Sequence, residues 1–262
     1  MSFLTRTGKP LPKSILDSAE AAKKDPVNRR EFLALASAFG ATTATAYAMI
    51  GMPAPAFAAA HKEGGTVRMQ MEVRALKDPR TYDWSQIANF SRGWLEYLAI
   101  WENDGTFTPA LLESWEINDN ATEYTLNVRK GVTWNDGTPF TADDVVRNII
   151  GWCDKSVEGN SMAGRFATLI DEETGKALDG AITAVDDHTV KLALPRPDIT
   201  LIPGMADYPA AIVPEGFDAE KMLENPIGTG AYLPESLEVG VKSVLVKNTD
   251  HKWWGTEVYG GP

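Results

Sequence analysis

The stretch from Trp115 to Ile150 constrains the fold most, because its apolar residues first occur at every second position and then at helical spacing. In its first half apolar residues alternate with polar ones, at Tyr124, Leu126 and Val128. This is the pattern of a strand with one buried face, and the Asn-Asp-Asn turn at 118–120 predicts a hairpin. In its second half apolar residues recur at helical spacing, at Val145, Val146, Ile149 and Ile150. The chain therefore has to combine a sheet with helices, as an α/β protein.

Three carboxylates in this stretch, Asp136, Asp143 and Asp144, allow two interpretations. As acids beside Trp134 they would suit an exported hydrolase. As structural groups, Asp136 belongs to a turn, and Asp144 stands three residues after Thr141, where a carboxylate completes a helix capping box. Negative charge in the first helical turn also favours the helix dipole. We predict the structural roles and no catalytic residue.

The same two spacings predict further elements. They are a half-buried strand at 66–73, a helix with Ser85 as N-cap and apolar positions up to Leu98, a hairpin at 182–194, a glycine-bearing loop at 224–232 and a strand at 241–246. His188 falls in the turn of its hairpin, which favours a turn residue over a general base. The glycine loop lacks the lysine and the spacing of a phosphate-binding loop.

The first sixty residues predict an export signal. The sequence NRREFL contains Arg29 and Arg30, one spacer residue and Phe32, which is typical of twin-arginine signals. No charged residue occurs from 32 to 60, and an Ala-x-Ala site predicts cleavage near Ala58. The alternative is a retained anchor, since about 20 apolar residues span a bilayer. Small residues, threonines and two late prolines favour the cleaved signal.

Charge and reactive residues exclude several classes of protein. The formal net charge of −11 leaves no basic face for a nucleic-acid partner. Cys153 is the single cysteine, so neither an intrachain disulfide nor a thiolate cluster is possible. The three histidines, His61, His188 and His251, are widely spaced. We therefore predict no metal site and no cofactor.

Four blocks, taken in order, resemble the extracytoplasmic solute-binding proteins of ABC transporters, in the dipeptide/oligopeptide/nickel-binding family 5. They are PALLESWEINDNATEYTLNVRKGVTWNDGTPFTADDVV at 109–146, AVDDHTVKLAL at 184–194, NPIGTGAY at 225–232 and KNTDHKWWG at 247–255. Ala231 stands where the family usually has proline, and His251 and Lys252 replace its usual approach to the tryptophan. Neither departure disturbs the fold that the resemblance implies.

The resemblance implies a periplasmic binding protein-like fold of class II with an extra family-specific subdomain. Family members are roughly twice as long, so we expect the first lobe only, with the second lobe absent. The expected parts are a twin-arginine signal at 1–58, the core subdomain at 59–97 and 201–262, and the extra subdomain at 98–200.

The function implied is the periplasmic capture of a peptide or similar small solute for an ABC permease in the inner membrane. The twin-arginine translocase would act during export. The family position of the cleft implies a set of ligand-binding residues: Arg74, Asp78, Tyr82, Asp83, Trp84, Tyr208, Thr229, Gly230 and Tyr232. Besides the exported hydrolase, an interaction or chemosensory module made of a single lobe remains an alternative.

Overall fold

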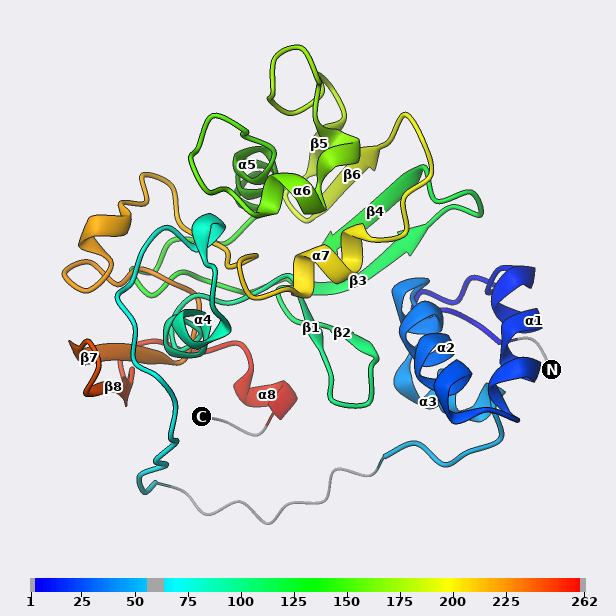
Figure 1. Cartoon of the computed structure of the whole chain (residues 1–262), viewed down its shortest axis with the longest axis horizontal. Coiled ribbons are helices and arrows are strands. Elements are labelled where there is room, and N and C mark those ends of the chain that lie inside the picture. Colours follow the sequence, from blue (N-terminus) through cyan, green and yellow to red (C-terminus); the bar gives the residue numbers. More distant parts are fainter. Residues whose placement is uncertain (1–2, 56–63, 260–262) are drawn as a thin grey trace.

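The computed structural model describes residues 3–55 and 64–259, which form a mixed α/β arrangement (Figure 1). Its helices are α1 (Lys13–Ala22), α2 (Pro26–Ala38), α3 (Thr43–Met49), α4 (Ser85–Ser91), α5 (Ala142–Trp152), α6 (Met162–Arg165), α7 (Leu201–Ala206) and α8 (Thr256–Tyr259). Its strands are β1 (Ala99–Trp101), β2 (Phe107–Pro109), β3 (Leu112–Ile117), β4 (Glu123–Val128), β5 (Ile182–Asp186), β6 (Thr189–Ala193), β7 (Tyr232–Glu238) and β8 (Lys242–Lys247). Single turns of 3-10 helix occur at Pro79–Thr81, Ala167–Leu169 and Ala219–Lys221.

A four-stranded antiparallel sheet in the order β3-β4-β6-β5 forms the centre of the main body. Its register pairs Tyr124 with Leu192 and Leu126 with Val190, so buried side chains line one face. The apolar side of α5 joins the core on that face. The β3–β4 and β5–β6 pairs confirm both predicted hairpins, and His188 lies in the turn between β5 and β6.

The start of α5 confirms the structural interpretation of the carboxylates. Thr141 occupies the N-cap, and a capping box joins it to Asp144. The Asp144 Oδ2 accepts a hydrogen bond from the Thr141 backbone N–H at 3.0 Å. The Asp136 carboxylate accepts from the backbone N–H and the hydroxyl of Thr138, at 2.9 and 2.7 Å.

The strand predicted at 66–73 is wrong. This segment joins no sheet within the described part of the chain, and Val67 and Met69 are 86% and 72% exposed. Its contact with the β7–β8 hairpin includes a hydrogen bond from the Gly240 N–H to the Val73 carbonyl at 2.8 Å. An alternating sequence becomes a strand only where a neighbour supplies hydrogen bonds and burial.

The helix predicted from Ser85 is shorter than its apolar spacing indicates. It ends at Ser91, and its N-cap position is Trp84, with no side-chain cap, so the N-cap predicted at Ser85 is wrong. The chain turns at Gly93 and Trp94, whose carbonyls accept hydrogen bonds from the start of β7 and from the loop before it. These tertiary bonds replace the helical turn that the spacing would have continued.

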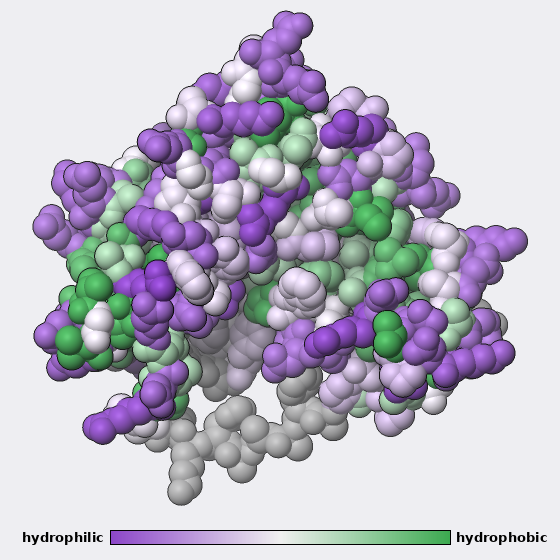
Figure 2. All heavy atoms as spheres, in the orientation of Figure 1, coloured by the Kyte–Doolittle hydropathy of each residue, from purple (hydrophilic) through white to green (hydrophobic). Residues whose placement is uncertain are grey.

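The β7–β8 hairpin is separate from the central sheet, and β8 confirms the strand predicted at 241–246. Val239, Val241 and Val246 are 58%, 64% and 39% exposed. Figure 2 shows apolar side chains gathered at the lower left, where Figure 1 places this hairpin. The hairpin therefore carries apolar surface that the described residues leave uncovered.

Helices α1, α2 and α3 form a separate N-terminal unit with its own small apolar core. Arg29, Arg30 and Phe32 all lie in α2. Within residues 3–55 and 64–259, no helix has both the length and the apolar character to cross a bilayer. The cleavage predicted near Ala58 falls outside the described residues.

Candidate functional site

The predicted ligand-binding residues form two groups, one before and one after the short helix α4. In the first group the Arg74 guanidinium lies over the Trp84 ring, 4.3 Å from its centroid. Trp84 is 48% exposed, and Arg74 also pairs with Glu72 at 2.8 Å. A cation held over an exposed indole is stabilised by the ring quadrupole. The pair therefore presents aromatic surface and positive charge together.

Two carboxylates of this loop hold local structure. Asp78 caps the 3-10 turn by accepting from the Arg80 N–H at 3.0 Å, and it pairs with the Arg80 guanidinium at 2.6 Å. Arg80 in turn donates to the Gly151 carbonyl in α5 at 3.2 Å, which ties the loop to the main body. The hydrogen bonds that the Arg80 guanidinium donates to Asp78 raise the pKa of Arg80. Asp83 lies at the surface and pairs with Lys77 at 2.9 Å.

Tyr82 and Tyr208 meet beneath the loop. Tyr82 is fully buried in a small cluster with Ile87 and Ala88 of α4, and Tyr208 packs against this cluster. The Tyr208 carbonyl accepts a hydrogen bond from the Tyr97 hydroxyl at 2.8 Å. The contact explains why the loop and the segment around Tyr208 share one surface, although 126 positions separate Tyr82 from Tyr208 (208 minus 82).

The second group consists of Thr229 and Gly230 in the loop before β7 and Tyr232, the first residue of β7. The Gly230 N–H donates to the Trp94 carbonyl and the Tyr232 N–H to the Gly93 carbonyl, both at 2.9 Å. Thr229 is buried, and Tyr232 is half-buried. A β-carbon at Gly230 would lie 2.6 Å from the Gly93 carbonyl oxygen. Glycine is required here for close backbone approach, and the loop is held by backbone hydrogen bonds.

Glu96 is a feature of this region that the sequence analysis missed. Its carboxylate accepts hydrogen bonds from the indole N–H groups of Trp253 and Trp254, at 3.0 and 2.7 Å. Part of the residue is exposed, but the carboxylate lies beneath the indoles, and its burial raises the pKa of Glu96 to about 7. The available signal was a single acidic residue within the apolar run Trp94–Leu98.

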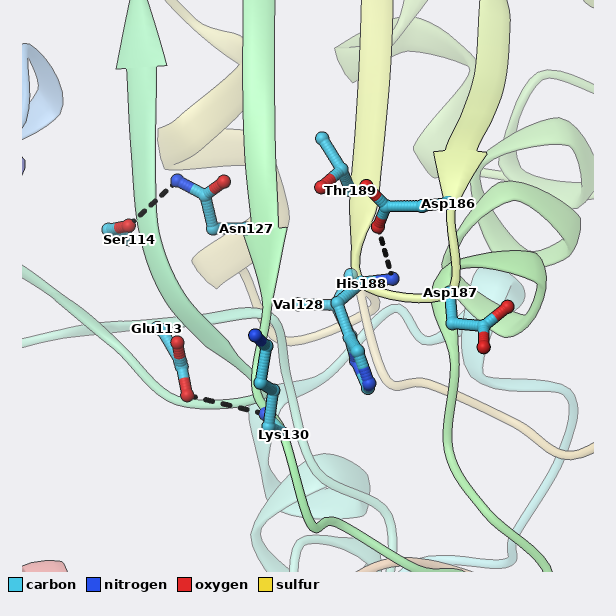
Figure 3. Close-up of a pocket in the computed structure, with 9 residues that line it drawn as sticks. All are labelled: Glu113, Ser114, Asn127, Val128, Lys130, Asp186, Asp187, His188 and Thr189. Atoms are coloured by element: carbon cyan, nitrogen blue, oxygen red, sulfur yellow. Dashed lines mark hydrogen bonds between the residues drawn. The ribbon is translucent and has the colours of Figure 1, made fainter.

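A separate hollow of about 560 Å³ lies at one end of the central sheet (Figure 3). Polar side chains from neighbouring strands form a row across it, at Ser114, Asn127, Thr189 and Asp186. His188 and Lys130 lie below this row, and the Asn127 amide donates to the Ser114 hydroxyl at 2.8 Å. The lining is that of the solvated face of an antiparallel sheet. None of the predicted ligand-binding residues contributes to it.

The carboxylates that a hydrolase would need are engaged elsewhere. Hydrogen bonds from Thr138 lower the pKa of Asp136. Asp144 accepts from Thr141, pairs with Arg147 at 2.7 Å and lies 3.3 Å from the Trp134 indole nitrogen. Among the residues that the structure describes, no group of three or more His, Cys, Asp or Glu side chains stands close enough to hold a metal ion.

Comparison with known proteins gives one consistent family. Residues 106–260 match the profile of the bacterial extracellular solute-binding proteins, family 5 Middle. The chain is 32% identical over 218 residues to the periplasmic murein peptide-binding protein MppA of Escherichia coli K12, covering 74% of this chain and 39% of that protein. It is 29% identical over 192 residues to the periplasmic oligopeptide-binding protein OppA of the same organism, covering 68% of this chain and 34% of that one.

Solved structures show the same fold over a similar share of their length. The unliganded open form of the murein tripeptide-binding protein MppA gives a TM-score of 0.60 at 25% identity, covering 71% of this chain and 38% of that one. Haemophilus influenzae OppA in complex with RPPGFSPFR gives 0.59 at 22% identity, with the same coverage. The chain thus spans little more than a third of the relatives it matches, from 34% to 39%.

Proposed function

The chain belongs to the bacterial extracellular solute-binding proteins of family 5, and on that premise we propose that it captures a solute for an ABC importer. The relatives above are named as periplasmic binding proteins for oligopeptides and murein peptides. A peptide or similar small solute is therefore the proposed ligand. The protein would deliver it to a membrane permease without chemically changing it.

The observation that carries this proposal is the exposed pair of Arg74 and Trp84. Its loop is anchored to α5 through Arg80 and lies over the buried Tyr82, so the pair is presented from a supported surface. An aromatic ring packs on apolar parts of a peptide, while a guanidinium binds a carboxylate or carbonyl oxygen. Tyr208 extends this surface, and Tyr232 reaches it beyond α4, while Thr229 and Gly230 are buried and would act by positioning Tyr232.

The test compares two exposed tryptophans in the product of the complete reading frame. Reading the coding DNA past the codon for Pro262 comes first, because hinged binders enclose their ligand between two lobes. Trp84→Ala should weaken peptide affinity about fivefold in calorimetric titration, as expected for the loss of an aromatic contact. Trp101 is 58% exposed on β1, outside the proposed surface, so Trp101→Ala is the matched control. Equal affinity in the two variants would remove Trp84 from the site.

We also propose that residues 1–58 direct the protein to the periplasm through the twin-arginine translocase, with cleavage near Ala58. The support is the arginine pair before Phe32 and the uncharged stretch that follows it. Replacing Arg29 and Arg30 together with lysine should stop export and leave the precursor in the cytoplasm, as measured by fractionation. Normal export of that double variant would exclude this route.

A further inference from the structure

The N-terminal unit, defined here as residues 3–50, is hydrogen-bonded to the folded body. The Ser37 hydroxyl accepts from the backbone N–H of Phe107 in β2 at 2.8 Å, and it donates to the Leu33 carbonyl at 2.8 Å. The Trp115 indole of β3 donates to the Ala38 carbonyl at 2.7 Å. Ser37 and Trp115 are 1% and 3% exposed. Separating the two parts would therefore break buried hydrogen bonds.

The facing surfaces of the N-terminal unit and of the folded body also fit closely. Gly40 has a φ of +86°, and a β-carbon there would stand 3.1 Å from the Trp115 carbonyl oxygen. Ile117 packs against the cores of both the unit and the body, and Lys9 forms an ion pair with Glu116. The hollow that remains beside Gly40 and Trp115 is about 10 Å³. Close backbone approach, apolar packing and an ion pair therefore all contribute to the contact.

In this arrangement the arginine-pair motif is closed, in the sense that its phenylalanine, Phe32, is buried and inaccessible to a receptor. Phe32 and Leu33 are 2% and 3% exposed within the core of the unit. Arg29 is half-buried, while Arg30 reaches the surface beside Gly105 at the tip of the β1–β2 hairpin. A receptor that binds the arginines together with the phenylalanine needs Phe32 outside this core. Helix α2 must therefore leave the unit before the whole motif can be bound.

We propose that the folded body holds the end of α2 through β2 and β3, and so keeps α2 in the N-terminal unit, with Phe32 buried, until α2 is released. The inference rests on the proposed role of residues 1–58 as an export signal. The binding surface consists of the Phe107 N–H, the Trp115 indole and Glu116. Because β3 is an edge strand of the central sheet, the unit also covers an edge that its departure would expose.

Trp115→Phe in the full chain tests the contact, because it removes the indole N–H and leaves the signal sequence unchanged. Losing one buried hydrogen bond should raise the population of the state with α2 released about fivefold. Amide hydrogen exchange measured over residues 26–41 should accelerate by that factor. Trp152 is equally buried in the main core, where its ring packs on Phe166, so Trp152→Phe is the matched control and should leave this exchange unchanged.

Reversing the charges of the Lys9–Glu116 ion pair provides a second test that does not change any core residue. Lys9→Glu and Glu116→Lys each place like charges together and should accelerate exchange in α2. The double variant restores the opposite charges and should return exchange toward the wild-type rate. Two results together would show that the contact does not hold α2. The first is exchange in Trp115→Phe that is unchanged, or accelerated only as much as in Trp152→Phe. The second is the absence of rescue in the double variant.

Export kinetics then separate the inference from the proposed function. In pulse-chase experiments on the precursor, Trp115→Phe should leave the cytoplasm severalfold faster than wild type, and Trp152→Phe should not. Faster exchange without faster export would show that the contact exists but does not close the motif, which overturns the inference. If the lysine substitutions at Arg29 and Arg30 leave export normal, the proposed signal role is wrong. The hydrogen-exchange measurements still test whether the body holds α2.

Discussion

At the scale of single residues, Glu96 shows how strongly the surroundings of a side chain change its chemistry. Both indole donors come from a segment more than 150 positions away in the chain. Their hydrogen bonds favour the ionised carboxylate, but burial outweighs them and raises the pKa of Glu96 from its usual value near 4.5 to about 7. The carboxyl group of Glu96 therefore titrates near neutral pH.

This pKa predicts how stability changes with pH. The folded state holds the Glu96 proton more tightly than the unfolded state, so the stabilisation is fully present below pH 4.5 and is lost as pH rises through about 7. The free energy of unfolding, measured in urea by tryptophan fluorescence, should fall between pH 5 and pH 8. Glu96→Gln cannot ionise and should flatten this decline, whereas Glu123→Gln, an exposed control on β4, should keep it. The same slope in both variants would contradict the prediction.

At the scale of elements, the start of α5 shows a local rule deciding a local structure. Thr141 and Asp144 satisfy backbone groups that the first helical turn leaves free. Asp144 also reaches Arg147 and the Trp134 indole, so one side chain joins the helix to the preceding turn. Cap, ion pair and indole together explain why a carboxylate is needed here without any catalytic role.

Substitutions in this turn should affect stability in a defined order. Thr141→Ala removes the cap and should lower the free energy of unfolding by about 0.5–2 kcal/mol. Asp143 is exposed in the same turn and acts through the helix dipole alone, so Asp143→Asn should lower it by about 0.3–1 kcal/mol. Urea unfolding of both variants measures the difference. If Asp143→Asn lowers the free energy of unfolding more than Thr141→Ala does, the charge in the first turn contributes more to stability than the N-cap.

At the scale of the whole molecule, the decisive contacts join segments far apart in sequence. The loop 227–232 lies on the turn at Gly93 and Trp94, and the N-terminal unit lies on β2 and β3. Gly228 marks the tightest of these approaches, because a β-carbon there would stand 1.9 Å from the Trp94 carbonyl oxygen. Backbone occupies the space that a side chain would need.

Gly228→Ala should therefore separate the loop from the turn and lower the free energy of unfolding by about 1–3 kcal/mol, the usual range for overpacking. The proposed second part of the ligand surface should move with it, so peptide affinity should fall as well. Gly164 lies in α6 with open space where a β-carbon would stand and no positive φ, which makes Gly164→Ala the matched control. Thermal unfolding that shifts equally in both variants would contradict the close approach.

Sequence alone predicted much of the central body, because its signals are local. Alternation placed the hairpins of β3–β4 and β5–β6, and the spacing of Thr141 and Asp144 placed the start of α5. The family resemblance, carried by four short blocks, also held. Each of these signals lies within about forty consecutive residues, where the physical cause and its effect are close together.

Only the tertiary structure decided the remaining features. The alternating segment 66–73 has no strand beside it among the described residues. Helix α4 ends just before Gly93 and Trp94, whose carbonyls accept hydrogen bonds from residues 230 and 232, far along the chain. The indole partners of Glu96 and the contact of the N-terminal unit with Trp115 likewise depend on segments that meet only after folding. Periodicity reports which side of a segment is apolar. It does not report which other segment will cover that side.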